Sequence, residues 1–254
     1  MELNKQLRRT IVEMACCAGE GHIPSAFSIV EVLEALYSWM RVDPSNPKWP
    51  DRDYFILSKG HGCLALYVVL EKHGFISHAD LDGYCQPGCI LGEHPEATIP
   101  GVEMSTGSLG HGLPFGVGLA LGLRLLGKPN RVFVLVGDGE CNEGTTWESA
   151  TLASHLHLGN LCCIVDDNGS AILPMHPLAA KWSAFGWHVW HVDGHSPVDL
   201  SRILNRIAFA HCGRPQALIA HTIKGKGVPF MEGAGQWHHR IPDSSEREKI
   251  KEAL

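Results

Sequence analysis

The feature that most constrains the fold is the stretch from residue 132 to residue 168. It opens with a continuous apolar run, residues 132–136, which is typical of a strand buried on both faces of a sheet. A Gly-Asp-Gly turn around Asp138 follows, and then a helical segment with one apolar face. A second apolar run, residues 161–165, leads to Asn168. This pattern predicts one βαβ unit.

A right-handed crossover makes the two strands parallel, so Asp138 and Asn168 should emerge at the same edge of the sheet. A carboxylate beside an amide oxygen suits a hard cation such as Mg²⁺ or Ca²⁺. The alternative is that both are ordinary turn residues after strands. Two such signals at the distance of a βαβ unit favour the metal site.

The rest of the chain alternates helical and strand patterns in the same way. Apolar residues recur at helical spacing in residues 3–18, 29–40, 63–73, 113–126, 147–158 and 197–212. Runs suited to strands are residues 54–57, 132–136, 161–165, 187–192 and 216–221. The alternation predicts an α/β fold, with a parallel β-sheet of about five to six strands and helices on both faces. We expect a single domain spanning residues 1–254.

Polar motifs follow most of the predicted strands. They are Lys59-Gly60-His61, Asp138, Asn168, Asp193 and Lys224. Ligands of parallel sheets bind at the carboxyl ends of strands, so the sequence predicts that these motifs converge on one site.

Two predicted helices begin with capping residues. Ser28 and Glu31 have the spacing of a capping box for the helix 29–40, and Ser196 is a suitable cap for the helix 197–212. The helix 113–126 is apolar and rich in glycine, which suggests a buried subunit interface.

Composition limits the classes of partner. The net charge of -6 argues against nucleic acid and against an anionic membrane surface. The nine cysteines form no CxxC pair, and we expect the adjacent pairs Cys16-Cys17 and Cys162-Cys163 to be buried thiols. A reducing, cytoplasmic location follows, since the first residues are charged and no apolar run is long enough for a leader or a membrane span.

The motif GDG, about thirty residues, then Asn resembles the thiamine diphosphate motif of the transketolase superfamily. The tract GDGECNEGTTWESATLASHLHLGNLCCIVDDN is similar to transketolase itself, including Glu143 and the LGNL turn. This resemblance implies that Asp138, Asn168 and the backbone carbonyl of Ser170 hold a metal ion that bridges the two phosphates of the cofactor. Oxygen ligands and a diphosphate favour Mg²⁺.

The resemblance also implies a set of cofactor contacts. The residues are His61, Gly107, Ser108, Leu109, Gly137, Asp138, Gly139, Glu143, Asn168, Ile172 and Lys224. Lys224 lies in a Lys-Gly-Lys-Gly stretch common in these enzymes, and a solvated basic turn is an equal alternative.

Sixteen histidines are unusual for a chain of this length. Four resemble transketolase active-site histidines: His22, His61, His94 and His238, with His239 competing for the last place. The resemblance places His22 and His94 near the donor sugar, and His61 and His238 near the diphosphate and the reaction centre. Histidine suits such work because its pKa lies near the working pH.

Two segments depart from the family pattern. Gly107-Ser108-Leu109-Gly110 resembles TGPLG with Ser in place of Pro, and His111 stands where a glutamine is common. The segment that begins Gly21-His22 lacks the usual GHxGxxxS glycine. These changes border the expected donor site, so they concern the donor's identity more than cofactor binding.

The resemblance covers only the first of the three transketolase domains. The second domain supplies the glutamate that activates the cofactor and most of the groups that hold the sugar phosphate. We therefore expect the N-terminal subunit of a split transketolase, paired with a C-terminal subunit in a heterotetramer with two copies of each chain. The implied reaction moves a two-carbon ketol unit from a ketose phosphate to an aldose, with thiamine diphosphate as the electron sink.

Three alternatives stay open. The chain could belong to another thiamine diphosphate enzyme, such as a deoxyxylulose phosphate synthase or a 2-oxo acid dehydrogenase. It could be a non-catalytic homologue with an assembly or regulatory role. It could be a metal-binding protein built on its histidines, although no HExxH motif supports this.

Overall fold

The computed structural model describes residues 2–207, 213–233 and 235–254. The α-helices are α1 (Glu2–Ala18), α2 (Ile23–Phe27), α3 (Val30–Trp39), α4 (Cys63–Lys72), α5 (His78–Asp82), α6 (Gly112–Leu125), α7 (Gly144–His155), α8 (Leu178–Ala184), α9 (Pro197–Arg206) and α10 (Ser244–Ala253). The strands are β1 (Tyr54–Leu57), β2 (Val132–Gly137), β3 (Leu161–Asp167), β4 (His188–Asp193) and β5 (Gln216–His221). Short 3-10 helices lie at η1 (Gly60–Gly62), η2 (Gly139–Asn142) and η3 (Gly235–Trp237).

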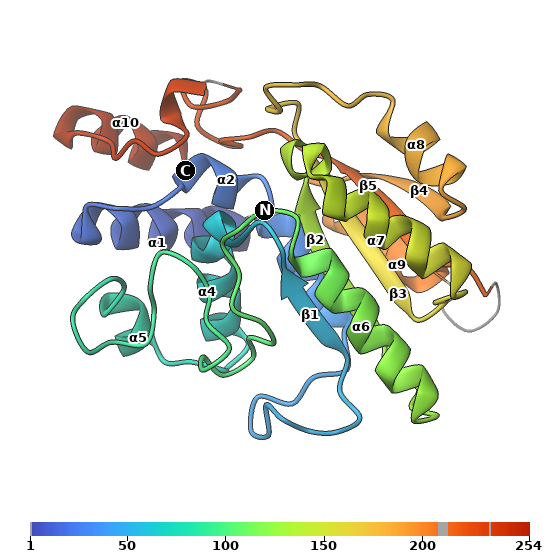
Figure 1. The fold of residues 1–254 in the computed structure, drawn as a ribbon. Helices are drawn as coiled ribbons and strands as arrows, with labels where there is room; N and C mark the ends of the chain where they lie inside the picture. The colour runs from blue at the N-terminus through green and yellow to red at the C-terminus, as the bar shows by residue number, and fades with distance from the viewer. Residues whose placement is uncertain (1, 208–212, 234) are drawn as a thin grey trace.

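The described strands form one parallel sheet in the order β1-β2-β3-β5-β4 (Figure 1). Strands β2 and β3 are direct neighbours, with Val132 opposite Leu161 and Gly137 opposite Asp166. The predicted βαβ unit and parallel α/β fold are confirmed. All carboxyl ends meet at one edge, which we call the rim.

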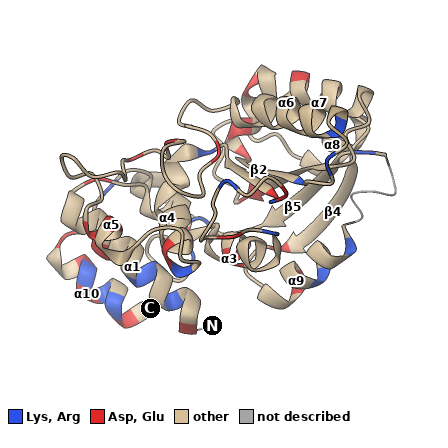
Figure 2. Ribbon diagram, turned by 90° about the horizontal axis from the view of Figure 1, so that it is seen from below, with Lys and Arg blue, Asp and Glu red and all other residues tan. Residues whose placement is uncertain are grey.

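Helices cover both faces of the sheet, as predicted. Figure 2 shows α6, α7 and α8 on one face and α3 and α9 on the other. Neighbouring residues of a strand point to opposite faces, so Phe133 packs in the core beneath α3 while Val134 packs beneath α6. Both faces of β2 are therefore apolar, which explains the continuous run in the sequence.

Helix α6 owes its glycines to close packing on its own sheet. A Cβ atom at Gly116 would lie 2.5 Å from Cγ2 of Val134. The helix buries Leu113, Val117, Ala120 and Leu123 against the sheet and leaves Phe115, Leu125 and Leu126 exposed. Many of the apolar residues that suggested a subunit interface are therefore buried in the core of the same chain.

The predicted capping box at Ser28 is wrong. Helix α3 begins after Ile29, which makes no side-chain cap. The Ser28 hydroxyl instead donates to Asp166 at 2.8 Å, and Glu31 accepts two bonds from Arg8. Both side chains thus bind buried charged residues of distant segments and do not form the local capping box.

Two further expectations changed in part. Ser196 caps α9 as predicted, but the helix ends at Arg206, and residues 208–212 lie outside the described part of the chain. Cys162 and Cys163 are buried, whereas Cys16 is half-buried and Cys17 is exposed, so the prediction of burial is wrong for the first pair. The buried face of α1 runs through Leu7, Ile11, Met14 and Ala15. The helical turn therefore points Cys16 and Cys17 away from this face.

Among the described residues, no helix has the length and apolarity needed to cross a membrane.

A buried carboxylate joins α1, α3 and the turn after β4. Glu31 accepts bonds from Arg8 at 2.6 and 2.7 Å, and its Oε2 lies 3.0 Å from Nδ1 of His195. Burial alone would raise the pKa of Glu31, but the bonds from His195 and Arg8 outweigh it and lower the pKa to about 2. The folded state therefore holds this carboxylate ionised.

We expect this cluster to make stability depend on pH in acid. A carboxylate with a depressed pKa stabilises the fold above its unfolded pKa, and this stabilisation of about 3 kcal/mol is lost as pH falls from about 4.5 through about 2. Urea unfolding of wild type and Glu31→Gln should show a stability gap that narrows from pH 5 toward pH 3. The exposed Glu13→Gln variant is the control. A gap that does not change with pH would contradict this account.

Candidate active site

The ends of β2 and β3 bring two oxygen ligands together at the rim. Oδ2 of Asp138 and Oδ1 of Asn168 both accept a hydrogen bond from the backbone N–H of Ser170, at 3.0 and 3.1 Å. The other oxygen of Asp138 accepts from the N–H of Gly139 at 2.8 Å. The strand order therefore places the predicted metal-binding residues side by side.

This oxygen set fits the implied metal. A carboxylate and an amide oxygen that converge on one backbone N–H supply hard ligands, which Mg²⁺ and Ca²⁺ prefer over imidazole or thiolate. Cys141, the cysteine near this point among the described residues, is fully buried.

A buried cation stands beside the oxygen set. Nζ of Lys224 lies 3.4 Å from Oγ of Ser170 and 2.8 Å from Nδ1 of His238. Lys224 is 7% exposed, so the alternative of a solvated turn is wrong for this residue. Burial, then the charge of Lys59, lowers the pKa of Lys224. A lysine ammonium group is a suitable hydrogen-bond donor for a phosphate group.

Beneath the rim lies a second buried charge pair. Nζ of Lys59 is 2.5 Å from Oδ2 of Asp166, and both side chains are almost fully buried. Asp166 also accepts bonds from Ser28, Thr222 and Asn168, the last at 2.9 Å. Burial would raise the pKa of Asp166, but Lys59 and these donors lower it. The pair thus fixes the amide of Asn168, the predicted metal ligand, through its hydrogen bond to Asp166.

Glu140 braces the loop that the resemblance assigned to the cofactor. Its carboxylate accepts bonds from the N–H groups of Gly110 at 2.8 Å and Gly137 at 3.2 Å, and from the hydroxyl of Ser58. Burial raises the pKa of Glu140, and these donors oppose the increase. The loop 107–110 is thereby tied to the end of β2.

The loop 107–110 also packs tightly on its other neighbours. A Cβ atom at Gly107 would lie 3.1 Å from the ring of His94, and one at Gly110, which has φ +80, would lie 2.7 Å from Cβ of Glu143. Ser108 is exposed and Leu109 is half-buried. The structure thus places His94 and Glu143 against this loop.

Three of the four predicted histidines form one cluster above the rim together with His239, whereas His94 lies against Gly107. The ring centroid of His22 lies 5.2 Å from that of His61, 5.1 Å from that of His238 and 4.5 Å from that of His239. His22 is therefore the centre of the cluster, and the two candidates in the tail both join it. His111 lies outside this cluster and contacts the carbonyl of Leu109.

The cluster favours neutral imidazoles. Burial, followed by the neighbouring histidines His239 and His238, lowers the pKa of His22 to about 4. Burial, followed by Lys59, lowers the pKa of His61 to about 2. Burial, followed by Lys224, also lowers the pKa of His238. Neutral rings can accept protons or hydrogen bonds from a polyol.

Comparison with known proteins decides the family. The model of the family described as transketolase, thiamine diphosphate binding domain, matches residues 2–254. The chain belongs to the transketolase family.

Two relatives of this transketolase-family chain are named as subunits of larger enzymes. The first is one subunit of the apulose-4-phosphate transketolase of Phocaeicola vulgatus, which is 40% identical over 250 residues, covering 95% of this chain and 89% of that one. The second is the SqwG subunit of the 6-deoxy-6-sulfo-D-fructose transketolase of a Clostridium species, which is 40% identical over 236 residues, covering 89% of this chain and 86% of that one.

Solved transketolases share the fold. A mutant transketolase of Pichia stipitis in complex with fructose 6-phosphate has a TM-score of 0.92 at 28% identity. The transketolase of Campylobacter jejuni has a TM-score of 0.91 at 28% identity. The alignments cover 98% and 99% of this chain but only 40% and 42% of those chains.

The sequence analysis missed three residues that contribute to the site, and it named one cofactor contact whose role is still a prediction. Asp166, Ser28 and Glu140 were not predicted, although an acid directly after the Gly-Asp-Gly turn is a signal that could have indicated Glu140. Ile172 is 96% exposed, and its place at the cofactor stays a prediction. Asp193 ends the edge strand β4, where its carboxylate accepts from the N–H of His195.

The charge pair under the rim should be essential for the fold of this transketolase-family chain. Lys59→Met leaves Asp166 buried without its cation, which should cost about 3–5 kcal/mol of unfolding free energy. Urea unfolding measures the loss, with the exposed Lys48→Met as the control, expected within about 0.5 kcal/mol of wild type. A loss no larger than the control's would contradict the role assigned to the pair.

His22 and His61 should stay neutral at physiological pH. We expect the rings of His22 and His61 to show no protonation between pH 8 and pH 6 in long-range ¹⁵N–¹H spectra, because their pKa values are lowered to about 4 and about 2. The imidazole signals are assigned by comparison with the His22→Gln and His61→Gln variants. The chain unfolded in urea gives the titration of histidines without the effects of the fold. A midpoint near the ordinary value of about 6.5 for either ring would refute the expectation.

Proposed function

We propose that this chain is the thiamine diphosphate-binding subunit of a two-polypeptide transketolase, which transfers a two-carbon ketol unit from a ketose to an aldose acceptor. The observation that carries the proposal is the rim itself, where oxygen ligands, a buried lysine and a histidine cluster converge. Family membership supports the same interpretation. We take residues 1–254 as one cofactor-binding domain in a cytoplasmic enzyme.

The cofactor-binding residues follow from the geometry of the rim. Asp138 and Asn168 would hold Mg²⁺, because their oxygens converge on one backbone N–H, and the family resemblance adds the backbone carbonyl of Ser170. Lys224, which lies beside Ser170, and His61 would contact the diphosphate of the cofactor. The bound cofactor would supply an electron sink for breaking and forming the carbon–carbon bond next to the sugar carbonyl.

The loop 107–110 would support the organic part of the cofactor. Gly107, Ser108 and Leu109 would present backbone and apolar surface to it, with Gly137 and Gly139 leaving room around the metal. Glu140 would keep this loop in place through its bond to Gly110.

The histidines would act on the substrate's oxygens. His22 and His94 would contact the hydroxyl and carbonyl groups of the donor, while His238 and His61 would assist proton transfers. The depressed pKa values of His22 and His61 support this, because neutral rings accept hydrogen bonds from sugar hydroxyls.

The partner is a C-terminal transketolase subunit. Support comes from the two relatives named as subunits, whose lengths this chain spans by 89% and 86%. Exposed Phe115, Leu125 and Leu126 on α6 and Leu152 on α7 offer apolar surface for assembly. We propose a heterotetramer with two copies of each subunit.

The donor should be sought among ketoses with an anionic end. The two relatives are named for apulose 4-phosphate and 6-deoxy-6-sulfo-D-fructose. A ketose phosphate and a sulfonated ketose are therefore the first donors to screen once the complex binds its cofactor.

Calorimetric titration of thiamine diphosphate in the presence of Mg²⁺ tests the proposal. The titration is run on this chain with and without the polypeptide encoded beside it. We expect binding only with the partner present, and at least about 100-fold weaker binding for Asp138→Ala, since that change removes a direct metal ligand. Asp193→Ala, which removes another rim carboxylate on the edge strand, should bind like wild type.

Either opposite outcome is informative. Full-strength binding by this chain alone would refute the two-polypeptide assembly. Absence of binding with the partner present would favour the non-catalytic alternative.

A further inference from the structure

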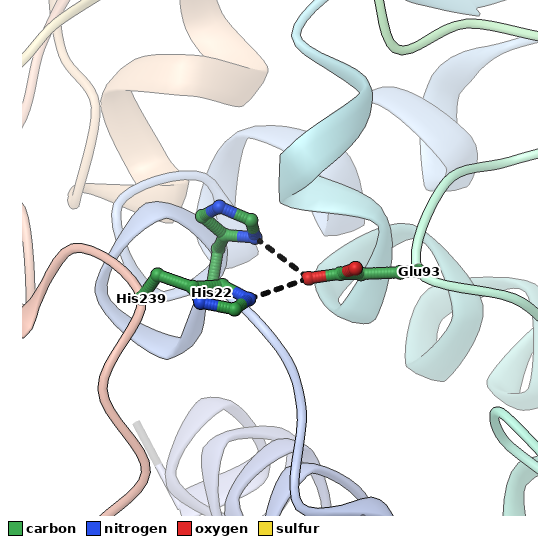
Figure 3. A group of neighbouring side chains, drawn as sticks. All are labelled: His22, Glu93 and His239. Carbon is green, nitrogen blue, oxygen red and sulfur yellow. Dashed lines mark hydrogen bonds and ion pairs between the residues drawn. The ribbon is translucent and has the colours of Figure 1, made fainter.

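A second group of metal-type ligands lies at the outer side of the histidine cluster. One nitrogen of His22, one nitrogen of His239 and one carboxylate oxygen of Glu93 all lie within 4.8 Å of one another (Figure 3). Nε2 of His239 is 2.6 Å from Oε1 of Glu93, and Nδ1 of His22 is 3.7 Å from the same oxygen. We call these three residues the outer triad.

We propose that the outer triad binds a divalent transition-metal ion of the zinc class. Two imidazoles and one carboxylate are a known ligand set for zinc sites that keep a fourth position open to water. Among the described residues the group consists of these three ligands, so the fourth position of the ion would be left to water.

The geometry needs small side-chain rotations. Zinc–ligand bonds of about 2.0–2.1 Å place tetrahedral ligand atoms roughly 3.4 Å apart. The two separations from Glu93, 2.6 and 3.7 Å, lie on either side of that value, and the two imidazole nitrogens lie within 4.8 Å of each other. The side chains of Glu93 and His239 are 28% and 52% exposed, so each can turn without disturbing the core.

An unsatisfied atom points to a missing partner. Nδ1 of His22 is buried and has no hydrogen-bond partner, although its ring is held in the centre of the cluster. A buried polar atom without a partner is costly, and a metal ion on Nδ1 would satisfy it while leaving Nε2 of the same ring for the donor. The carboxylate of Glu93 faces this nitrogen in Figure 3.

The outer triad differs in chemistry from the oxygen set at the rim. Imidazole ligands favour zinc, copper or nickel, whereas the Asp138 and Asn168 oxygens favour Mg²⁺. The two sites should therefore select different metals. The triad also draws on three separate segments, the loop after α1, the irregular stretch before α6 and the tail after η3, so a bound ion would cross-link them.

Metal titration of the full chain tests the proposal without any need for activity. The chain is treated with a chelator, supplied with excess Mg²⁺ to fill the oxygen set, and titrated with Zn²⁺ by calorimetry and with Co²⁺ by visible absorption. We expect one-to-one uptake, a Co²⁺ spectrum of tetrahedral type and a Tm that rises with Zn²⁺. Glu93→Gln and His239→Ala should each weaken Zn²⁺ binding by at least about tenfold.

The many surface histidines require a matched control. His78 is exposed and lies 3.3 Å from a carboxylate oxygen of Glu71, which resembles the His239–Glu93 pair without a second imidazole. His78→Ala should leave the one-to-one uptake unchanged, and circular dichroism should show that every variant is folded. If the Co²⁺ spectrum is absent, or survives unchanged in both Glu93→Gln and His239→Ala, the triad is an ion pair only. Because the readout is metal uptake by this chain, it is independent of thiamine diphosphate binding.

Discussion

The rim depends on the buried ion pair between Lys59 and Asp166. Asp166 sits at the end of a central strand, where an unpaired carboxylate would be strongly destabilising. Lys59 compensates that charge, and the remaining lone pairs of Asp166 accept bonds from Ser28, Thr222 and Asn168. This pair thus links the ends of β1 and β3 with the segment after β5. It also orients the amide of Asn168, the predicted metal ligand. The same cation helps to keep His61 neutral.

Two kinds of ligand chemistry lie next to each other above this pair. Oxygens from Asp138 and Asn168 form the inner position, and the imidazoles around His22 form the outer one. Lys224 lies at the junction, in contact with both Ser170 and His238. The arrangement separates a hard-metal and phosphate site from a region that suits hydroxyl groups or a softer metal. Under the proposed function, this division would let one edge of a sheet hold an anionic cofactor and still offer neutral bases to a polyol.

Local motifs failed where buried charges had distant partners. Ser28 and Glu31 have the spacing of a capping box, but each found a stronger partner in another segment, Asp166 for the first and Arg8 for the second. The sequence around Lys224 is equally consistent with a solvent-exposed basic turn. In the structure the side chain is buried, and His238 of the C-terminal tail contacts its Nζ. In each case the contact is determined by the free-energy cost of leaving a buried polar group unpaired. The spacing of residues in the sequence carries no information about such distant partners.

The sequence by itself determined the parallel α/β fold and the pairing of Asp138 with Asn168. Both follow from apolar runs of strand length and from the handedness of one crossover, which are local properties. Only the tertiary structure decided that Glu140 braces the loop 107–110 and that His239 joins His22 and Glu93. These contacts join residues 30 to more than 200 positions apart, and side-chain packing between separate segments brings them together.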